Sequence, residues 1–239
     1  MKTQTVNEVF YEVLEELHSK HLPSRNSFFQ RLAAFPHEKL RSSTFLGELY
    51  FRYQAACHAT RVMIYHIPHL DSPPLRVRKL RFISDDDGLE GGDTHHYQLS
   101  RAFAHMGADF IIPDEEFGDL SQLKKLLDPT TVRFLSLVQD LYPNSLGPWC
   151  IIEAFADDWM KALMNSLAGC FPSIKKEPYF ADCFAQGIEE RHARESLNLT
   201  GEVLLRSPEL LMETIDGARM MAIGLDDFWS GLERLLVEG

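Results

Sequence analysis

The chain has 239 residues, of which 45% are hydrophobic, an ordinary fraction for a folded protein with a sizeable core. Its 24 basic and 35 acidic side chains give a formal net charge of −11. Nucleic acids and anionic membrane surfaces both select for a basic footprint. We therefore expect neither a nucleic acid nor a membrane as a partner.

The cysteines contain no Cys-x-x-Cys pair, so the sequence does not predict a zinc ribbon or a redox motif. We expect reduced, buried thiols at all four positions, Cys57, Cys150, Cys170 and Cys183. The first residues lack the apolar centre of a signal peptide, and no apolar run is long enough to cross a membrane. These features predict a cytoplasmic protein.

The spacing of apolar residues predicts helices from the start of the chain. An amphipathic stripe follows Thr5, and Glu8 stands three residues later, as in a capping box. A short helix is expected over 28–34 and a long one over about 38–65, ending before a group of prolines. A further helix over 75–84 should end in a loop at 85–92, because three glycines fall in that segment.

The second half of the chain shows the same helical spacing. Helices are expected over 94–107, 120–127, 130–141 and 148–167, then from Pro178 continuously through Glu189, and finally over 208–237 in one or two pieces. No alternating strand pattern, internal repeat or linker is found. We therefore predict one all-α domain spanning residues 1–239.

Glu189 and His192 are the first candidate metal ligands. Residues three apart share one face of a helix, so both side chains can reach a single ion. Asp182 lies seven residues earlier and would fall on nearly the same stripe of a continuous helix. The alternatives are a hydrogen-bonded core histidine at 192 and a solvated aspartate in the first turns of the helix.

Glu153 is a carboxylate on an otherwise apolar helical stripe, with Trp149, Ala156 and Met160. An unpaired buried carboxylate costs several kcal/mol or takes up a proton, and a metal ion relieves that cost. The alternatives are a protonated glutamate, a glutamate paired with an arginine, or a stripe at the edge of the core.

The segment after residue 84 offers further donors. Asp86 lies in a run of three aspartates, for which a solvated loop is the alternative interpretation. At most one of the neighbouring His95 and His96 can face the core, because adjacent helical residues point about 100° apart. His96 shares its face with Leu99 and is our choice, and we expect His95 to tolerate substitution. Glu48 is the least specific of the candidate carboxylates.

Several catalytic signatures are absent from the sequence. There is no glycine-rich phosphate loop, no Gly-x-Ser-x-Gly elbow and no His-Glu-x-x-His zinc helix. A ferritin-type di-iron bundle uses two Glu-x-x-His pairs, whereas only one is present here. The familiar ferritin arrangement is therefore disfavoured, but iron is not.

Taken together, these motifs resemble those of the haem-oxygenase-like di-iron oxidases over roughly residues 45–199. The matching residues are an acid before a glycine (Asp86, Gly88), a histidine before a leucine (His96, Leu99), the glycine-led helix Gly147 to Glu153, and the Tyr-Phe opening at 179 followed by Glu189 and His192. The chain departs from the family pattern at Ala185, where a histidine is expected. Asp182, one turn earlier, is our expected replacement.

The resemblance implies a single-domain bundle of about seven core helices that holds two Fe(II) ions and uses O2 as co-substrate. One iron would be held by His96, Glu153 and His192, and the other by acids drawn from Asp86, Glu189, Asp182 and Glu48. Glu153 and His192 would be the catalytic residues. Family members act on amino acids, amines and fatty acids, and one branch converts a tryptophan derivative to a nitrile. We therefore expect a small amino acid or amine as substrate, in secondary metabolism, together with an external electron donor and a homodimer.

Two other functions remain open at this point. A metal-free, thiaminase-like hydrolase of similar fold would need a reactive cysteine, for which Cys150 or Cys183 could serve. A non-catalytic helical interaction protein would leave the inward carboxylates and histidines without a role. Metal analysis distinguishes both from an iron enzyme.

Overall fold

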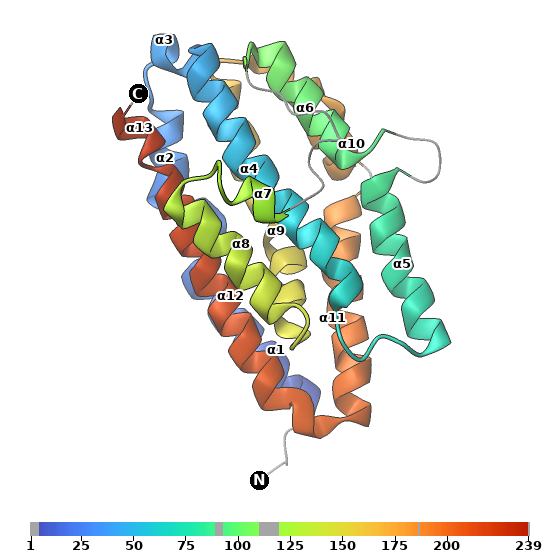
Figure 1. Cartoon of the computed structure of the whole chain (residues 1–239). Coiled ribbons are helices and arrows are strands. Elements are labelled where there is room, and N and C mark those ends of the chain that lie inside the picture. Colours follow the sequence, from blue (N-terminus) through green and yellow to red (C-terminus); the bar gives the residue numbers. More distant parts are fainter. Residues whose placement is uncertain (1–4, 89–92, 110–119, 186, 239) are drawn as a thin grey trace.

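The computed structural model describes residues 5–88, 93–109, 120–185 and 187–238, and every regular element in these ranges is a helix. The long helices run along the length of the molecule (Figure 1). They are α1 (Val6–His21), α4 (Ser43–Met63), α8 (Pro129–Leu141), α9 (Gly147–Ala168), α11 (Ile188–Arg206) and α12 (Leu211–Leu232). The prediction of a single all-α domain is confirmed at this level.

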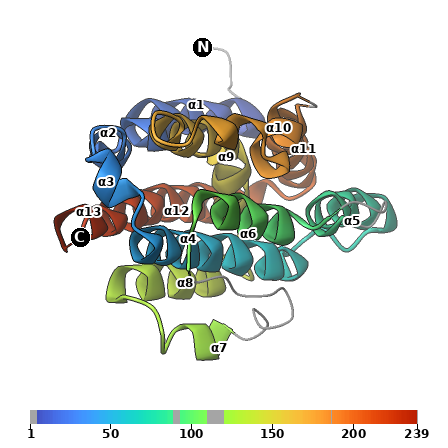
Figure 2. The same ribbon diagram turned by 90° about the horizontal axis from the view of Figure 1, so that it is seen from above.

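The remaining helices lie around this frame. They are α2 (Ser27–Ala33), α3 (His37–Leu40), α5 (Pro73–Asp87), α6 (His95–Met106), α7 (Leu120–Leu123), α10 (Pro178–Ala185) and α13 (Leu235–Glu238). Seen from above, α5 lies at one edge, beside α11 and α6 (Figure 2). No helix among the described residues is both long enough and apolar enough to cross a membrane.

Helix α9 forms the centre of the core. It packs against α11, α12 and α2, and most of its side chains are buried, as expected for a helix that is apolar on nearly all sides. Its first residue, Gly147, lies directly against α12. A Cβ atom at this position would be 1.9 Å from the Thr214 carbonyl oxygen, so only glycine allows the two backbones to approach this closely.

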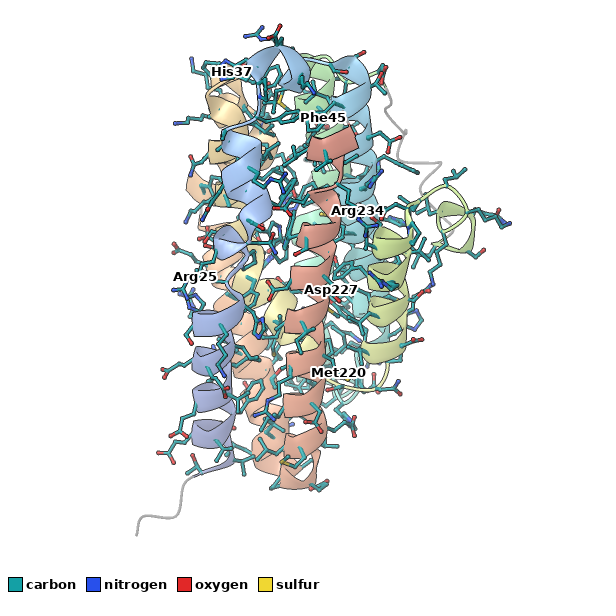
Figure 3. The ribbon with its side chains drawn as sticks, turned by 90° about the vertical axis from the view of Figure 1, so that its left-hand side faces the viewer. Arg25, His37, Phe45, Met220, Asp227 and Arg234 are labelled. Atoms are coloured by element: carbon teal, nitrogen blue, oxygen red, sulfur yellow. The ribbon has the colours of Figure 1, made fainter. Side chains whose placement is uncertain are left out.

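Helix α12 covers one side of α9. Its inner face contributes Trp229, which packs against Phe28, Phe29, Tyr53 and Trp159. Its outer face carries Met220 and Asp227, and Arg234 follows its end (Figure 3). The two faces together give α12 the amphipathic pattern of a helix at the edge of a bundle.

Local signals in the sequence explain several helix ends. Thr5 and Glu8 form the expected capping box, in which Thr5 N donates to Glu8 Oε2 at 2.6 Å and Glu8 N donates to Thr5 Oγ1 at 3.3 Å. Asp128 caps α8 by accepting hydrogen bonds from the backbone N–H groups of Thr130 and Thr131.

Several expected boundaries were wrong, including that of the helix expected over 120–127, which ends at Leu123. The predicted helix over 38–65 is divided into α3 and α4. Helix α5 continues to Asp87 and ends at Gly88, whose φ of 67° is the left-handed conformation typical after a helix. The expected loop at 85–92 therefore begins three residues later, and residues 89–92 lie outside the described part of the chain.

A further correction, to the helix after Pro178, changes the candidate site. The predicted continuous helix from Pro178 through Glu189 is two helices, α10 and α11. Gly187, with φ 59°, precedes α11. Because the helical phase is interrupted there, residues before and after 187 no longer share a face at intervals of seven.

Candidate metal centre

The first group of donors lies where α9 packs against α11. Glu153 on α9 and Glu189 and His192 on α11 each offer a ligand atom, and these atoms lie within 4.8 Å of one another. His192 Nδ1 is 3.7 Å from Glu153 Oε2. Three of the residues predicted from the sequence are thus brought together, in a set that could hold one cation.

A second group adjoins the first and shares Glu189 with it. His95 on α6 and Cys183 on α10 offer ligand atoms that, with the Glu189 carboxylate, also lie within 4.8 Å of one another. His95 Nε2 is 3.8 Å from Cys183 Sγ. One carboxylate therefore belongs to two donor groups, which is the arrangement of a bridging ligand.

The first group and two members of the second, His95 and Glu189, line one cavity of about 80 Å³, whereas Cys183 lies behind His95 and is not part of its wall. Glu153, Glu189, His192, His95 and Asp86 all line it. Cys57, Ile152, Ala156, Trp159, Met160 and Tyr179 form the less polar part of its wall. A volume of this size accommodates several water molecules or a pair of ions.

Hydrogen bonds orient Glu153 and His192. Trp149 Nε1 donates to Glu153 Oε1 at 2.9 Å, from one turn earlier on α9. His192 Nε2 lies 3.0 Å from Asp85 Oδ2, and Arg191 also binds that oxygen at 2.8 Å. When Nε2 carries the proton donated to Asp85, the lone pair of Nδ1 faces the cavity, as in the carboxylate–histidine–metal arrangement of many metal sites.

A second carboxylate orients His95 in the same way. Asp86 Oδ1 lies 3.0 Å from His95 Nδ1. The opposite nitrogen, Nε2, faces Cys183. Asp85 and Asp86 are adjacent on α5, so one end of this helix supports both imidazoles of the site.

The pKa values of these groups reflect burial together with mutual attraction. Burial raises the pKa of Glu153 to about 8 and also raises that of Glu189. The pKa of His192 is raised to about 9, because its bond to Asp85 and the nearby carboxylates outweigh the opposing effect of burial. Without a bound cation, the glutamates are therefore protonated or are paired with a protonated imidazole.

The His95–Asp86 pair is more strongly coupled. Burial alone would lower the pKa of His95, but the bond to Asp86 raises it well above its usual value. The pKa of Asp86 is lowered to about 2, since the stabilisation by His95 outweighs burial. Shifts of this kind, inside a cavity, are typical of functional sites.

The donor set fits transition-metal ions. Carboxylate oxygens and imidazole nitrogens suit iron, manganese and zinc, and the Cys183 thiol adds a softer donor. The Gln54 side chain lines the same cavity, and its Oε1 has no hydrogen-bond partner among the described residues although it is buried. Buried acceptors are seldom left unpaired, so this atom also indicates that a polar group belongs in the cavity.

His96 is buried as expected, but the structure does not bring it to the metal cavity. Its face of α6, shared with Leu99 and Phe103, packs against α4, where His96 Nδ1 contacts Gln54 Nε2. His95 points towards the cavity instead. The selection of His96 over His95 assumed that α6 buries only one face. In the structure α6 contacts α5 and α10 as well as α4, so both histidines are covered.

Asp182 and Glu48 also lie away from the site. Asp182 is exposed on α10, because the break at Gly187 changes the helical phase on which its selection depended. Glu48 Oε2 pairs with Arg52 at 3.4 Å near the surface, and its side chain is 50% exposed. The candidate site therefore contains neither residue, and His95 and Cys183 supply the additional donors.

Three residues of the site were missed by sequence reasoning. His95 could have been found from its position ten residues after Asp85, had both faces of α6 been considered. Asp85 was named only as part of the acidic run. No spacing signal linked Cys183 to Glu189, because the helix is interrupted between them.

The cysteines do not provide an activated nucleophile. Cys150 is fully buried and bonded to Thr200, and burial raises its pKa to about 12. Burial also raises the pKa of Cys183, despite the neighbouring His95. A thiol needs a lowered pKa to react as a thiolate. This geometry disfavours the hydrolase that the sequence left open.

Arg61 connects the metal cavity with a neighbouring hollow. It lines both the cavity and a hollow of about 250 Å³ that is also formed by His58, Tyr65 and His96. Its guanidinium has no ion-pair partner among the residues that the structure describes. Asp87 lines the same hollow, so groups of both charges meet a larger molecule there, with Arg61 on the side of the metal cavity.

Comparison with known proteins adds no family assignment. No protein-family model matches the chain, and no curated protein matches it significantly.

Proposed function

We propose that this protein is an O2-dependent non-haem di-iron oxidase or oxygenase that acts on a small amino acid or amine. The observation that carries the proposal is the pair of donor groups that share Glu189 beside one cavity. The haem-oxygenase-like identity of the bundle and the outcome of the reaction, including conversion of a tryptophan derivative to a nitrile, rest on the sequence resemblance alone.

The residues divide between two ions. Glu153, Glu189 and His192 would hold the first, and Glu189, His95 and Cys183 the second. Glu189 would bridge the two. We assign Asp86 to orienting His95 rather than to the position of a primary ligand, because its Oδ1 is engaged by His95 Nδ1. Three protein donors per ion would match the number of protein ligands in other oxygen-activating iron sites.

Ferrous iron bound in this way would supply the electrons and the open coordination positions that O2 activation requires. The chain's own contribution is to orient the ligands. Trp149 fixes Glu153, and Asp85 fixes His192 through the ring nitrogen that faces away from the cavity. Ile152, Ala156, Trp159 and Met160 give one part of the cavity wall an apolar surface.

Substrate binding is assigned to the hollow beside the cavity. Because the cavity of about 80 Å³ is too small for the substrate as well as two ions, the body of the substrate would occupy the neighbouring 250 Å³. Arg61 lies at the junction and would bind a carboxylate there. This residue favours an amino acid over a simple amine.

Metal stoichiometry tests the proposal. Chelator-treated protein would be reconstituted anaerobically with Fe(II), dialysed and analysed for iron, and then assayed for O2 consumption against a panel of amino acids and amines. We expect about two irons per chain. His95→Ala should lose one iron, whereas the matched neighbour variant His96→Ala should keep both, as should Asp182→Ala.

Cobalt substitution tests the second donor group separately. A thiolate ligand to Co(II) gives an intense charge-transfer band in the near ultraviolet, and Cys183→Ser should abolish it while leaving the first ion in place. Full iron binding by His95→Ala would contradict the site. Selective retention of zinc without O2 consumption would support a hydrolytic or structural metal site instead, since Cys, His and Glu are also zinc ligands.

A further inference from the structure

A second, larger hollow lies between α5 and α11, on the outer side of the metal centre. It has a volume of about 570 Å³, and four arginines and two carboxylates are among the residues that line it. The lining residues are Arg78, Arg81, Phe82, Ser84, Asp85, Arg191, His192, Arg194 and Glu195. The lining of the hollow therefore has a net positive charge, although the whole chain has a net charge of −11.

Two of these arginines already have acidic partners across the groove. Arg78 on α5 binds Glu195 on α11 at 2.5 Å and also pairs with Glu202. Arg191 on α11 binds Asp85 on α5 at 2.8 Å. These ion pairs hold the two helices together and leave little net charge at the ends of the groove.

Arg81 and Arg194 lie between these pairs, one on each helix. Both are exposed, and neither has an ion-pair partner among the residues that the structure describes. Two guanidinium groups therefore face one hollow without a compensating charge. A guanidinium fork binds phosphate oxygens with two parallel hydrogen bonds, and a phosphate monoester supplies close to two negative charges.

We propose that this hollow binds a small molecule through a phosphate group held by Arg81 and Arg194. The volume lies within the range of about 300–1,000 Å³ that is usual for small-molecule sites, so it exceeds what a free phosphate ion needs. Phe82 lies in the wall and offers an apolar surface to the rest of the ligand. The inference does not depend on the metal and goes beyond the proposed function.

The position of the hollow gives such a ligand a direct relation to the metal centre. Asp85 and His192 are part of its wall, and the Phe82 and His192 rings pack with their centroids 4.8 Å apart. One side of the His192 ring therefore faces the bound molecule, and the other side faces the metal cavity. A ligand here would lie one imidazole ring away from the proposed first ion.

Calorimetric titration of the chelator-treated full chain tests the site. The probes are inorganic phosphate, adenosine monophosphate and uncharged adenosine, at constant ionic strength because exposed charges are screened by salt. We expect both phosphate-bearing probes to bind and adenosine not to bind. We expect adenosine monophosphate to bind more tightly than phosphate, because the hollow is larger than a phosphate ion needs; equal affinity for the two would overturn the proposal that a larger molecule carries the phosphate.

The double variant Arg81→Gln/Arg194→Gln should weaken binding of adenosine monophosphate at least tenfold. The control, Arg25→Gln/Arg234→Gln, removes the same charge from exposed arginines on a different face of the molecule (Figure 3) and should bind normally. Circular dichroism of both variants checks folding. The proposal is overturned by no binding of either phosphate probe, by adenosine binding as well as its monophosphate, or by equal affinity in the two double variants.

Discussion

Replacing Glu153 by glutamine should stabilise the metal-free protein at high pH while removing its ability to hold the first ion. The Glu153 carboxyl has a pKa of about 8 in the folded protein against 4.5 when exposed. Between these values the folded state binds a proton that the unfolded state lacks, so the free energy of unfolding falls as pH rises from 4.5 to 8. Glutamine has no such titration and retains an oxygen for the bond from Trp149.

The size of the effect follows from the pKa difference. A shift from 4.5 to about 8 corresponds to about 5 kcal/mol once the carboxyl is fully ionised. The net stabilisation is smaller than this, because the variant also loses the attraction between His192 and a carboxylate 3.7 Å from its Nδ1. We therefore expect Glu153→Gln to raise the free energy of unfolding by about 2 kcal/mol at pH 9, and by less than about 1 kcal/mol at pH 5.

Urea denaturation of chelator-treated protein at the two pH values provides the measurement. Glu48→Gln is the control, because that exposed carboxylate has only a surface pair with Arg52 and should give the same small difference at both. A Glu153→Gln effect that does not change with pH would refute the reasoning that the carboxyl is buried and uncompensated. Iron analysis of the same variant should show loss of at least one ion.

The remaining predictions concern the site and the packing beneath it. Glu153→Ala and His192→Ala should each abolish turnover with an unchanged circular dichroism spectrum, and near-normal rates in either would contradict their role. Asp85→Asn should weaken metal binding roughly 10- to 100-fold in equilibrium dialysis, because it releases the outer nitrogen of His192; unchanged affinity would show that this bond does not support the ligand. Metal affinity should fall by more than tenfold between pH 8 and pH 7, because protons on Glu153 and His192 must leave, and a pH-independent Kd would contradict this. Gly147→Ala should lower the free energy of unfolding by about 3 kcal/mol through its clash with backbone, whereas Gly224→Ala, which meets only a leucine side chain, should cost less than half as much in urea denaturation.

The helices were predictable because each carries its own signals. The Thr5–Glu8 capping box and the apolar spacing of α9 are local patterns that packing does not alter. The breaks were harder to predict. Glycine at 187 is compatible with a helix in sequence terms, and only its left-handed conformation in the folded chain separates α10 from α11. Asp182 was misplaced for this reason.

The candidate site was predictable where a carboxylate or histidine interrupts an apolar stripe. Glu153, Glu189 and His192 satisfy this condition and lie together. His95 does not satisfy it, because the wall of a polar cavity shows no apolar periodicity. His96 does, and its burial against Gln54 shows that an inward-facing residue can pack against the core without reaching the site. The pattern identifies burial, whereas only tertiary structure identifies the partner.

The charge balance of the cavity is satisfied by one divalent ion, and the second ion depends on the donors that surround it. Three carboxylates, Glu153, Glu189 and Asp86, face the cavity, and in the absence of metal their charge is offset by raised proton affinity on the glutamates and on both imidazoles. Arg61 also lines the cavity, so one divalent ion with neutral imidazoles would bring the formal charge of these groups to zero. A second divalent ion would leave two positive charges, or one if Cys183 were a thiolate, so its binding depends on the additional donors His95 and Cys183. Because Glu189 belongs to both donor groups, the second ion requires no movement of the backbone.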